Sequence, residues 1–198
     1  MSKKNARGFL KKVERILKMV NFKLCTMDYK VGDITRLQCD ACVNAANKTL
    51  LGGGGVDGAI HRAAGTKLLE FCRGLGGCNT GEAKITPGFN LPAKFVIHTV
   101  GPIYSGSEKD PVDLANCYTN SLDLARDNGL KSIAFPCIST GVYGYPAKDA
   151  VKVALKAVTD WAGKNSTVKM AITFCCFSEK DGRLYEKALK ELADSLTD

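Results

Sequence analysis

The chain has 198 residues, of which 45% are hydrophobic and 24% are charged, a composition that fits one folded domain with a substantial core. No stretch approaches the roughly 20 apolar residues that cross a bilayer, so we expect no membrane span. The net charge of +8 is concentrated in residues 1–23, which hold eight basic side chains and one acidic side chain. The rest of the chain has 20 basic and 19 acidic residues. A nucleic-acid-binding surface would need basic residues spread over the domain, so nucleic acid is not the expected partner.

Apolar side chains recur at helical spacing near the amino end, at Leu10, Val13, Leu17 and Val20. We predict a basic N-terminal helical extension over residues 1–21, packed against a domain that spans residues 22–198. A membrane-surface helix and an organelle presequence are the alternatives. The nine cysteines are odd in number and lie in apolar contexts, which favours buried thiols in a reducing compartment. We therefore expect a cytoplasmic protein, with nuclear or organellar import through the basic segment left open.

Strand-like and helix-like patterns alternate over the rest of the chain. The expected strands cover residues 22–30, 41–44, 83–86, 95–100, 132–137 and 168–176, and the expected helices cover residues 57–73, 112–127, 147–163 and 180–195. Several of these strands are apolar throughout, which is typical of strands covered on both faces in an α/β sandwich. Ligands bind at the carboxyl ends of strands in such sheets, where segments 44–57, 139–143 and Phe177 would converge.

A glycine-rich segment follows the second expected strand, running from Asn44-Ala-Ala-Asn47 into Gly52-Gly-Gly-Gly-Val-Asp57-Gly. Glycines let backbone N–H groups close on an anion, and the helix that follows adds the positive end of its dipole, so the segment predicts a phosphate-binding loop. Asp57 would cap this helix, place a carboxylate beside the phosphate, or do both. Asn44 and Asn47 would be turn residues or would bond a sugar hydroxyl.

A second glycine-containing loop, Ser139-Thr-Gly-Val-Tyr143, would close the cradle from the opposite side. The first loop is not a Rossmann fingerprint, because it does not directly follow a strand, and no P-loop lysine is present. His61 and His98 belong to no recognisable triad or metal signature and are expected to be hydrogen-bonded structural residues. The pair Cys39-x-x-Cys42 has no second pair to complete a metal site, so no metal is predicted.

Five motifs together resemble the macrodomain family, and within it the MacroD-type ADP-ribosyl hydrolases. In chain order they are Gly32-Asp33-Ile34-Thr35, Val43-Asn-Ala-Ala-Asn47, Gly52-Gly-Gly-Gly-Val-Asp-Gly-Ala-Ile-His-Arg-Ala-Ala-Gly65, Leu91-Pro-Ala-Lys-Phe-Val-Ile-His-Thr-Val-Gly-Pro102 and Ile138-Ser-Thr-Gly-Val-Tyr-Gly-Tyr-Pro146. The resemblance covers roughly residues 29–190. It implies a three-layer α/β/α sandwich around a mixed, mostly parallel sheet, with ADP-ribose as the ligand.

The resemblance also implies how the ligand would lie. Asp33 and the Ile34 backbone would contact adenine, and Phe177 would pack on it. Asn47 would bond the distal ribose, and Tyr143 would wall it off. The diphosphate would lie between backbone N–H groups on two sides, from Gly54, Gly55 and Val56 and from Ser139, Thr140, Gly141, Val142 and Tyr143.

The implied activity is removal of mono-ADP-ribose from Asp and Glu side chains, and deacetylation of O-acetyl-ADP-ribose, without a metal or organic cofactor. Asp57 and Asn47 would be catalytic, with Asp57 activating a water held at the diphosphate; attack at the carbonyl and at the anomeric carbon are both open. The expected partners of this monomer are ADP-ribose, its esters and mono-ADP-ribosylated proteins. The alternatives are a non-catalytic ADP-ribose reader and a different nucleotide-phosphate-binding domain that acts on nucleic-acid ends.

Overall fold

The computed structural model describes residues 19–196. The strands are β1 (Val20–Phe22), β2 (Cys25–Val31), β3 (Ala41–Ala45), β4 (Ala83–Pro87), β5 (Phe95–Thr99), β6 (Ser132–Phe135) and β7 (Met170–Cys176). The helices are the short 3₁₀ helix η1 (Ile34–Arg36), α2 (Gly55–Ala64), α3 (Thr66–Gly74), α4 (Lys109–Asp127), α5 (Ala147–Lys164) and α6 (Glu179–Ser195). None of the described helices is both long enough and apolar enough to cross a membrane.

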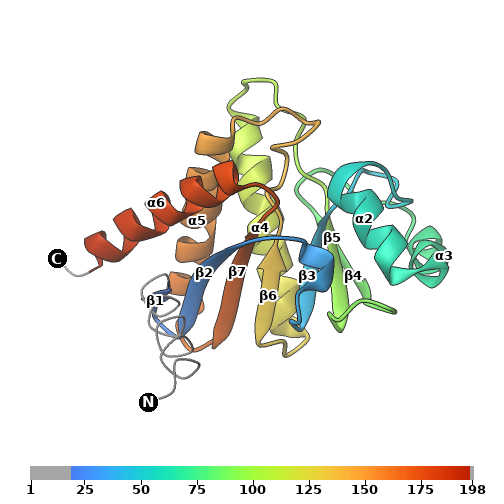
Figure 1. Cartoon of the computed structure of the whole chain (residues 1–198), viewed down its shortest axis with the longest axis horizontal. Helices are drawn as coiled ribbons and strands as arrows, with labels where there is room; N and C mark the ends of the chain where they lie inside the picture. Colours follow the sequence, from blue (N-terminus) through green and yellow to red (C-terminus); the bar gives the residue numbers. More distant parts are fainter. Residues whose placement is uncertain (1–18, 197–198) are drawn as a thin grey trace, which may run out of the picture.

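The strands form one sheet in the order β1-β2-β7-β6-β3-β5-β4. The five central strands, from β2 to β5 in this order, are parallel, and β1 and β4 pair antiparallel at the two edges. The carboxyl ends of the five parallel strands therefore lie along one edge of the sheet, below the loops drawn at the top of Figure 1. The predicted mixed, mostly parallel sheet is confirmed.

Helices cover both faces of the sheet, which confirms the predicted three layers. Helices α4, α5 and α6 pack on one face, and α2 and α3 pack on the other, near β3 and β4 (Figure 1). The larger core under α4–α6 contains an aromatic group in which Phe174 stacks on Tyr185 at 4.6 Å and Tyr118 contacts Phe135 at 4.9 Å between ring centroids. A smaller core lies under α2 and α3.

Two segments that were each predicted as one element form two elements in the structure. The strand expected over residues 22–30 is two antiparallel strands, because the chain turns at Lys23 with a φ of 56°. The helix expected over residues 57–73 is α2 and α3, which Gly65 separates with a φ of 85°. A side chain at this glycine would also collide with Asn90, whose Nδ2 lies 2.8 Å from the Cβ position.

The N-terminal extension falls mostly outside the described residues, which begin at residue 19. Val20 and Asn21, which were expected in the extension's helix, lie in β1 and pair with Met27 and Thr26 of β2. The sheet therefore begins two residues before the predicted domain start at residue 22.

Asp40 ties the starts of three neighbouring strands together. Its Oδ2 accepts hydrogen bonds from the backbone N–H groups of Lys131 at 2.8 Å and Ser132 at 3.1 Å, where β6 begins. Its Oδ1 accepts from Lys94 Nζ at 2.7 Å, just before β5. The bond from Lys94 is the main reason why the pKa of Asp40 is lowered.

Replacing Asp40 by alanine leaves two backbone donors at the start of β6 without their acceptor. We expect Asp40→Ala to lose about 1–3 kcal/mol of unfolding free energy, measured by urea denaturation. The control is Asp160→Ala, which removes an exposed ion pair with Lys156 on α5 and should change stability by less than about 0.5 kcal/mol. Equal losses in the two variants would contradict the strand-tying role.

Candidate functional site

Two of the residues predicted to bind adenine lie side by side at the ends of neighbouring strands. Gly32, directly after β2, donates its N–H to the carbonyl of Cys176, the last residue of β7, at 2.8 Å. Asp33 and Phe177 follow these two residues. Asp33 caps η1 by accepting from Thr35 N and Oγ1 at 2.9 and 2.7 Å, and these bonds lower its pKa. The Phe177 side chain is 87% exposed, which leaves its ring open to a ligand.

The glycine segment delivers its backbone to the start of α2, as predicted, but Asp57 is not the cap. The N-cap residue is Gly54, and Asp57 lies in the first turn of the helix with its side chain bonded elsewhere. Gly55 has a φ of 57°, a conformation that side chains rarely adopt. A Cβ atom on Gly54 or Gly55 would meet nothing within 4 Å, so this stretch of backbone faces open space. An anion can therefore approach it closely.

The two residues predicted to be catalytic lie against the same glycine. A Cβ atom on Gly53 would stand 3.1 Å from Asp57 Oδ2 and 3.2 Å from Asn47 Nδ2. Asn47 is held in place within its own loop, because Nδ2 donates to the Gly52 carbonyl at 2.9 Å and Oδ1 accepts from Thr49 Oγ1 at 2.6 Å. Loop geometry thus brings a carboxamide and a carboxylate to one point beside the open backbone.

The Asp57 carboxylate is buried and only half satisfied. The residue is 4% exposed, and its Oδ1 accepts a hydrogen bond from Asn44 Nδ2 at 2.7 Å. Its Oδ2 is buried and has no hydrogen-bond partner among the described residues. Burial raises the pKa of Asp57, although the bond from Asn44 and the charge of His61 oppose this effect. The unpartnered oxygen is therefore a stronger proton acceptor than that of a solvated aspartate.

His61 was expected to be a hydrogen-bonded structural residue, and the described structure does not show the expected hydrogen bond at its Nε2. Its Nε2 is buried, has no hydrogen-bond partner among the described residues, and lies 3.5 Å from Asp57 Oδ1. The signal was present in the sequence, because residues 57 and 61 are four apart and share one face of α2. Asn44 was also misjudged: it is a fully buried residue of β3, neither in a turn nor open to a sugar.

The second predicted loop follows β6, the neighbour of the strand β3 that precedes the glycine segment. Its first residue, Ser139, has a φ of 64°, and its buried Oγ has no hydrogen-bond partner among the described residues. Val142, at the tip, is 99% exposed. Tyr143 and Asn47 both line a cavity of about 490 Å³, so the two residues predicted to enclose the distal ribose do share one space.

The loop after β5 supports this second loop. Gly101 makes the closest contact, because a Cβ atom there would overlap the Ser139 side chain and Ile138. Tyr104 N donates to the Tyr143 carbonyl at 2.9 Å, and the rings of Tyr104 and Tyr145 lie 4.9 Å apart. The predictions did not include this support.

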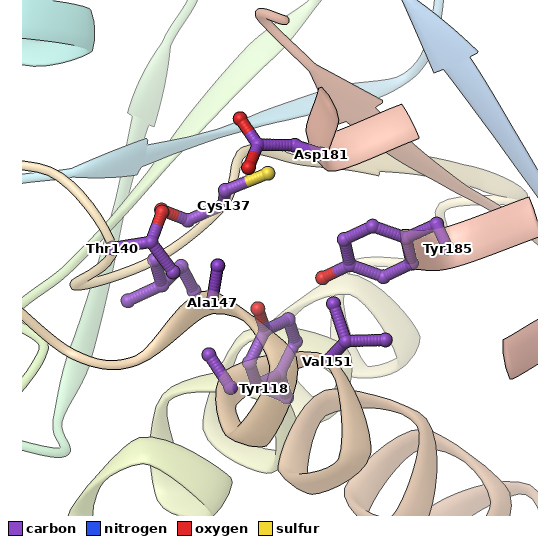
Figure 2. Close-up of a pocket in the computed structure, with 9 residues that line it drawn as sticks. Tyr118, Cys137, Thr140, Ala147, Val151, Asp181 and Tyr185 are labelled. Atoms are coloured by element: carbon purple, nitrogen blue, oxygen red, sulfur yellow. The ribbon is translucent and has the colours of Figure 1, made fainter. Parts of the chain in front are cut away.

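A second, much smaller cavity of about 10 Å³ lies behind the same loop (Figure 2). Thr140 and Cys137 line one side of it, and Tyr118 and Tyr185 of the larger core line the other. This volume holds at most about one water molecule, so it is a packing gap and not a ligand site.

Three side chains, His61, Cys72 and His98, offer potential metal ligands within 4.8 Å of one another. Both ring nitrogens of His98 are already engaged, with Asn44 Nδ2 at 3.1 Å and Thr86 Oγ1 at 3.1 Å. Burial raises the pKa of the Cys72 thiol to about 11, so it is protonated at neutral pH. A metal ion would have to break a hydrogen bond of His98 and remove the proton of Cys72, so these three side chains are poorly suited to bind a metal.

Comparison with known proteins places these features in a family. The model of the Macro domain family matches residues 43–154, which include both glycine-containing loops. The human protein named ADP-ribose glycohydrolase MACROD2 is 57% identical over 164 residues, 81% of this chain, although the match spans only 38% of that protein's length. A macro domain-containing protein of Ralstonia nicotianae is 59% identical over 161 residues, 81% of this chain and 92% of its own length.

Solved structures agree with the sequence comparison. The Oceanobacillus iheyensis macrodomain with ADP superposes with a TM-score of 0.85 at 44% identity, covering 89% of this chain and 96% of that one. The Trypanosoma brucei macrodomain in complex with ADP-ribose gives 0.77 at 47% identity, covering 82% and 68%. The fold, the order of the motifs and these matches lead to one conclusion: the chain belongs to the Macro domain family.

Proposed function

We propose that this protein hydrolyses the ester that links ADP-ribose to Asp and Glu side chains of proteins, and that it deacetylates O-acetyl-ADP-ribose by the same chemistry. The observation that carries the proposal is the buried, unpartnered Oδ2 of Asp57 beside the open backbone of Gly54 and Gly55. A module that only binds a diphosphate gains nothing from a desolvated carboxylate next to it, because like charges repel.

The relatives support the choice of ligand. Two of the solved macrodomains bind ADP and ADP-ribose, and the human relative is named a glycohydrolase of ADP-ribose. In the proposed complex the diphosphate lies between segment 54–56 and segment 139–143. The adenine lies between Asp33 and Phe177, and the distal ribose lies in the cavity that Asn47 and Tyr143 line.

The proposed reaction uses Asp57 as a general base. A water between Oδ2 and the diphosphate gives a proton to Oδ2 as its oxygen attacks the ester. Attack at the anomeric carbon breaks the bond to the carboxylate, which leaves as an anion. Attack at the carbonyl carbon breaks the bond to the ribose oxygen, which leaves with the proton that Asp57 returns. Burial supports this role, because it raises the pKa of Asp57 and so makes the carboxylate a stronger base. The other carboxylate oxygen, Oδ1, is held away from the water by Asn44 at 2.7 Å and by His61 at 3.5 Å.

Replacing Asp57 by asparagine tests the function directly. Asparagine keeps the shape of the side chain and an acceptor for Asn44, but it cannot take a proton from water. We expect Asp57→Asn to lower kcat about 10²- to 10⁴-fold while the dissociation constant for ADP-ribose stays within a few-fold. The substrate is a peptide mono-ADP-ribosylated on glutamate, free ADP-ribose is followed with time, and affinity is measured by calorimetry.

The matched control for this experiment is Asp160→Asn, an exposed acid on α5 that should change neither quantity. Tight ADP-ribose binding by the wild-type protein without any release of ADP-ribose would overturn the proposal and leave the reader function in its place.

The same substitution should raise stability. The folded state raises the pKa of Asp57 above its unfolded value, so the ionised carboxylate costs folding free energy at neutral pH. This cost disappears as the pH falls below the unfolded value, about 3.9, where the side chain is protonated in both states. We therefore expect Asp57→Asn to melt at a higher temperature than the wild type at pH 7, by a margin that shrinks toward pH 4. A lower melting temperature at pH 7 would contradict the cost of the buried charge.

A further inference from the structure

Two fully buried polar residues, Asn44 and His98, stand behind the proposed base. They are register partners on the parallel strands β3 and β5, so their side chains project from the same face of the sheet, toward α2. Neither residue reaches the open backbone or the 490 Å³ cavity. The reaction proposed above uses Asn44 only as a donor to Asp57 and gives His98 no role, so the cost of burying the imidazole needs another explanation.

The directions of the hydrogen bonds define a chain from Asp57 into the sheet. Asn44 Nδ2 donates to Asp57 Oδ1 at 2.7 Å, and it lies 3.1 Å from His98 Nδ1. An amide nitrogen can only donate, so His98 Nδ1 must carry a lone pair. The proton of the neutral ring is then on Nε2, which lies 3.1 Å from Thr86 Oγ1. Thr86 in turn donates to the Pro87 carbonyl at 3.1 Å, which ends the chain at the backbone of β4.

The ring stays neutral at any pH at which the protein would work. Burial, helped by the nearby His61, lowers the pKa of His98 to about 3. A protonated ring would set its Nδ1–H against the N–H of Asn44. The other titratable groups on this face are Cys72 of α3, whose Sγ is 3.8 Å from Nε2, and Lys84 of β4, whose Nζ donates to the Leu75 carbonyl.

In the described part of the chain, two acceptors, Asp57 Oδ1 and His98 Nδ1, set the orientation of the Asn44 carboxamide. Its Oδ1 is buried and has no hydrogen-bond partner there. A half-turn of the amide would exchange Nδ2 for Oδ1 and set an oxygen against the Asp57 carboxylate. It would also set that oxygen against the lone pair of His98 Nδ1, so both neighbours favour the observed orientation.

We propose that His98 is a positioning residue that acts through Asn44: its Nδ1 keeps the amide N–H turned toward Asp57, and so holds that carboxylate ionised and aimed with its free oxygen toward the substrate. The consequence for catalysis rests on the proposed function. The consequence for the ionisation of Asp57 does not, so the two are tested separately.

The first test uses the unaltered protein. The chain contains only two histidines, so both imidazoles are readily assigned in long-range ¹H–¹⁵N spectra of the labelled protein. We expect His98 to be the Nε2–H tautomer at every pH from 5 to 8. A proton on Nδ1, or titration of this ring within that range, would overturn the proposal even if no variant folded.

The second test measures the ionisation of Asp57 from its ¹³C carboxyl shift, assigned by comparison with Asp57→Asn. Removing the acceptor with His98→Leu, or the donor with Asn44→Leu, should raise the Asp57 midpoint by about one pH unit, the worth of one charge-assisted hydrogen bond. The double variant should move it no further, because both changes remove the same interaction. His98→Asn, whose Oδ1 takes the place of Nδ1, should bring the midpoint back toward the wild-type value.

Thr99→Val is the control, because Thr99 is equally buried, adjoins His98 on β5 and points to the opposite face, where its hydroxyl donates to the Glu82 carbonyl at 2.8 Å. It should leave the Asp57 midpoint unchanged. A folded His98→Leu protein with the wild-type midpoint, or additive shifts in the double variant, would overturn the proposal.

Activity separates the two proposals. If the wild type releases ADP-ribose, the pH at which kcat falls on the acidic side of its pH profile should shift with the Asp57 midpoint in each variant, while KM changes little. If it releases none, the proposed function fails, and the ¹³C titration still decides whether His98 acts through Asn44.

Discussion

The chemistry proposed for this protein depends on a carboxylate, that of Asp57, which the fold buries and which has a hydrogen-bond partner on only one of its two oxygens in the described structure. A buried charge of this kind opposes folding, and the two hydrophobic cores on either side of the sheet must offset its cost. The same burial makes the unpartnered oxygen a stronger base in the proposed reaction. The property that lowers the stability of the fold at Asp57 is therefore the one that the proposed function uses.

The parallel sheet supplies the frame for this arrangement. Five strands end at one edge, and each of the four segments assigned to the ligand leaves from one of those ends. The residues that support the base come from inside the same strands, one layer deeper, where Asn44 and His98 lie opposite each other. In the proposed function, loops therefore contact the ligand while positions within the strands hold the base, a division that suits a site in which hydrogen-bond angles matter.

Much of this was predictable from the sequence, for identifiable reasons. Apolar runs indicated covered parallel strands, and glycines that precede a helix indicated an anion site, because both patterns reflect local backbone requirements. The break at Gly65 was missed because a single glycine is often tolerated within a helix, and the sequence does not reveal the φ of 85° that this residue adopts between α2 and α3. The role proposed for His98 could not be predicted, because it depends on the register of β3 against β5, which no local sequence pattern encodes.

The contact between Gly101 and Ser139 has a consequence for motion. No side chain fits between these residues, and Tyr104 adds a backbone bond to Tyr143 and a ring contact to Tyr145. The loops after β5 and β6 are thereby joined at three points, so one loop can move only if the other moves with it or these contacts break. Tyr143 also lines the cavity of about 490 Å³, so the shape of that cavity depends on both loops.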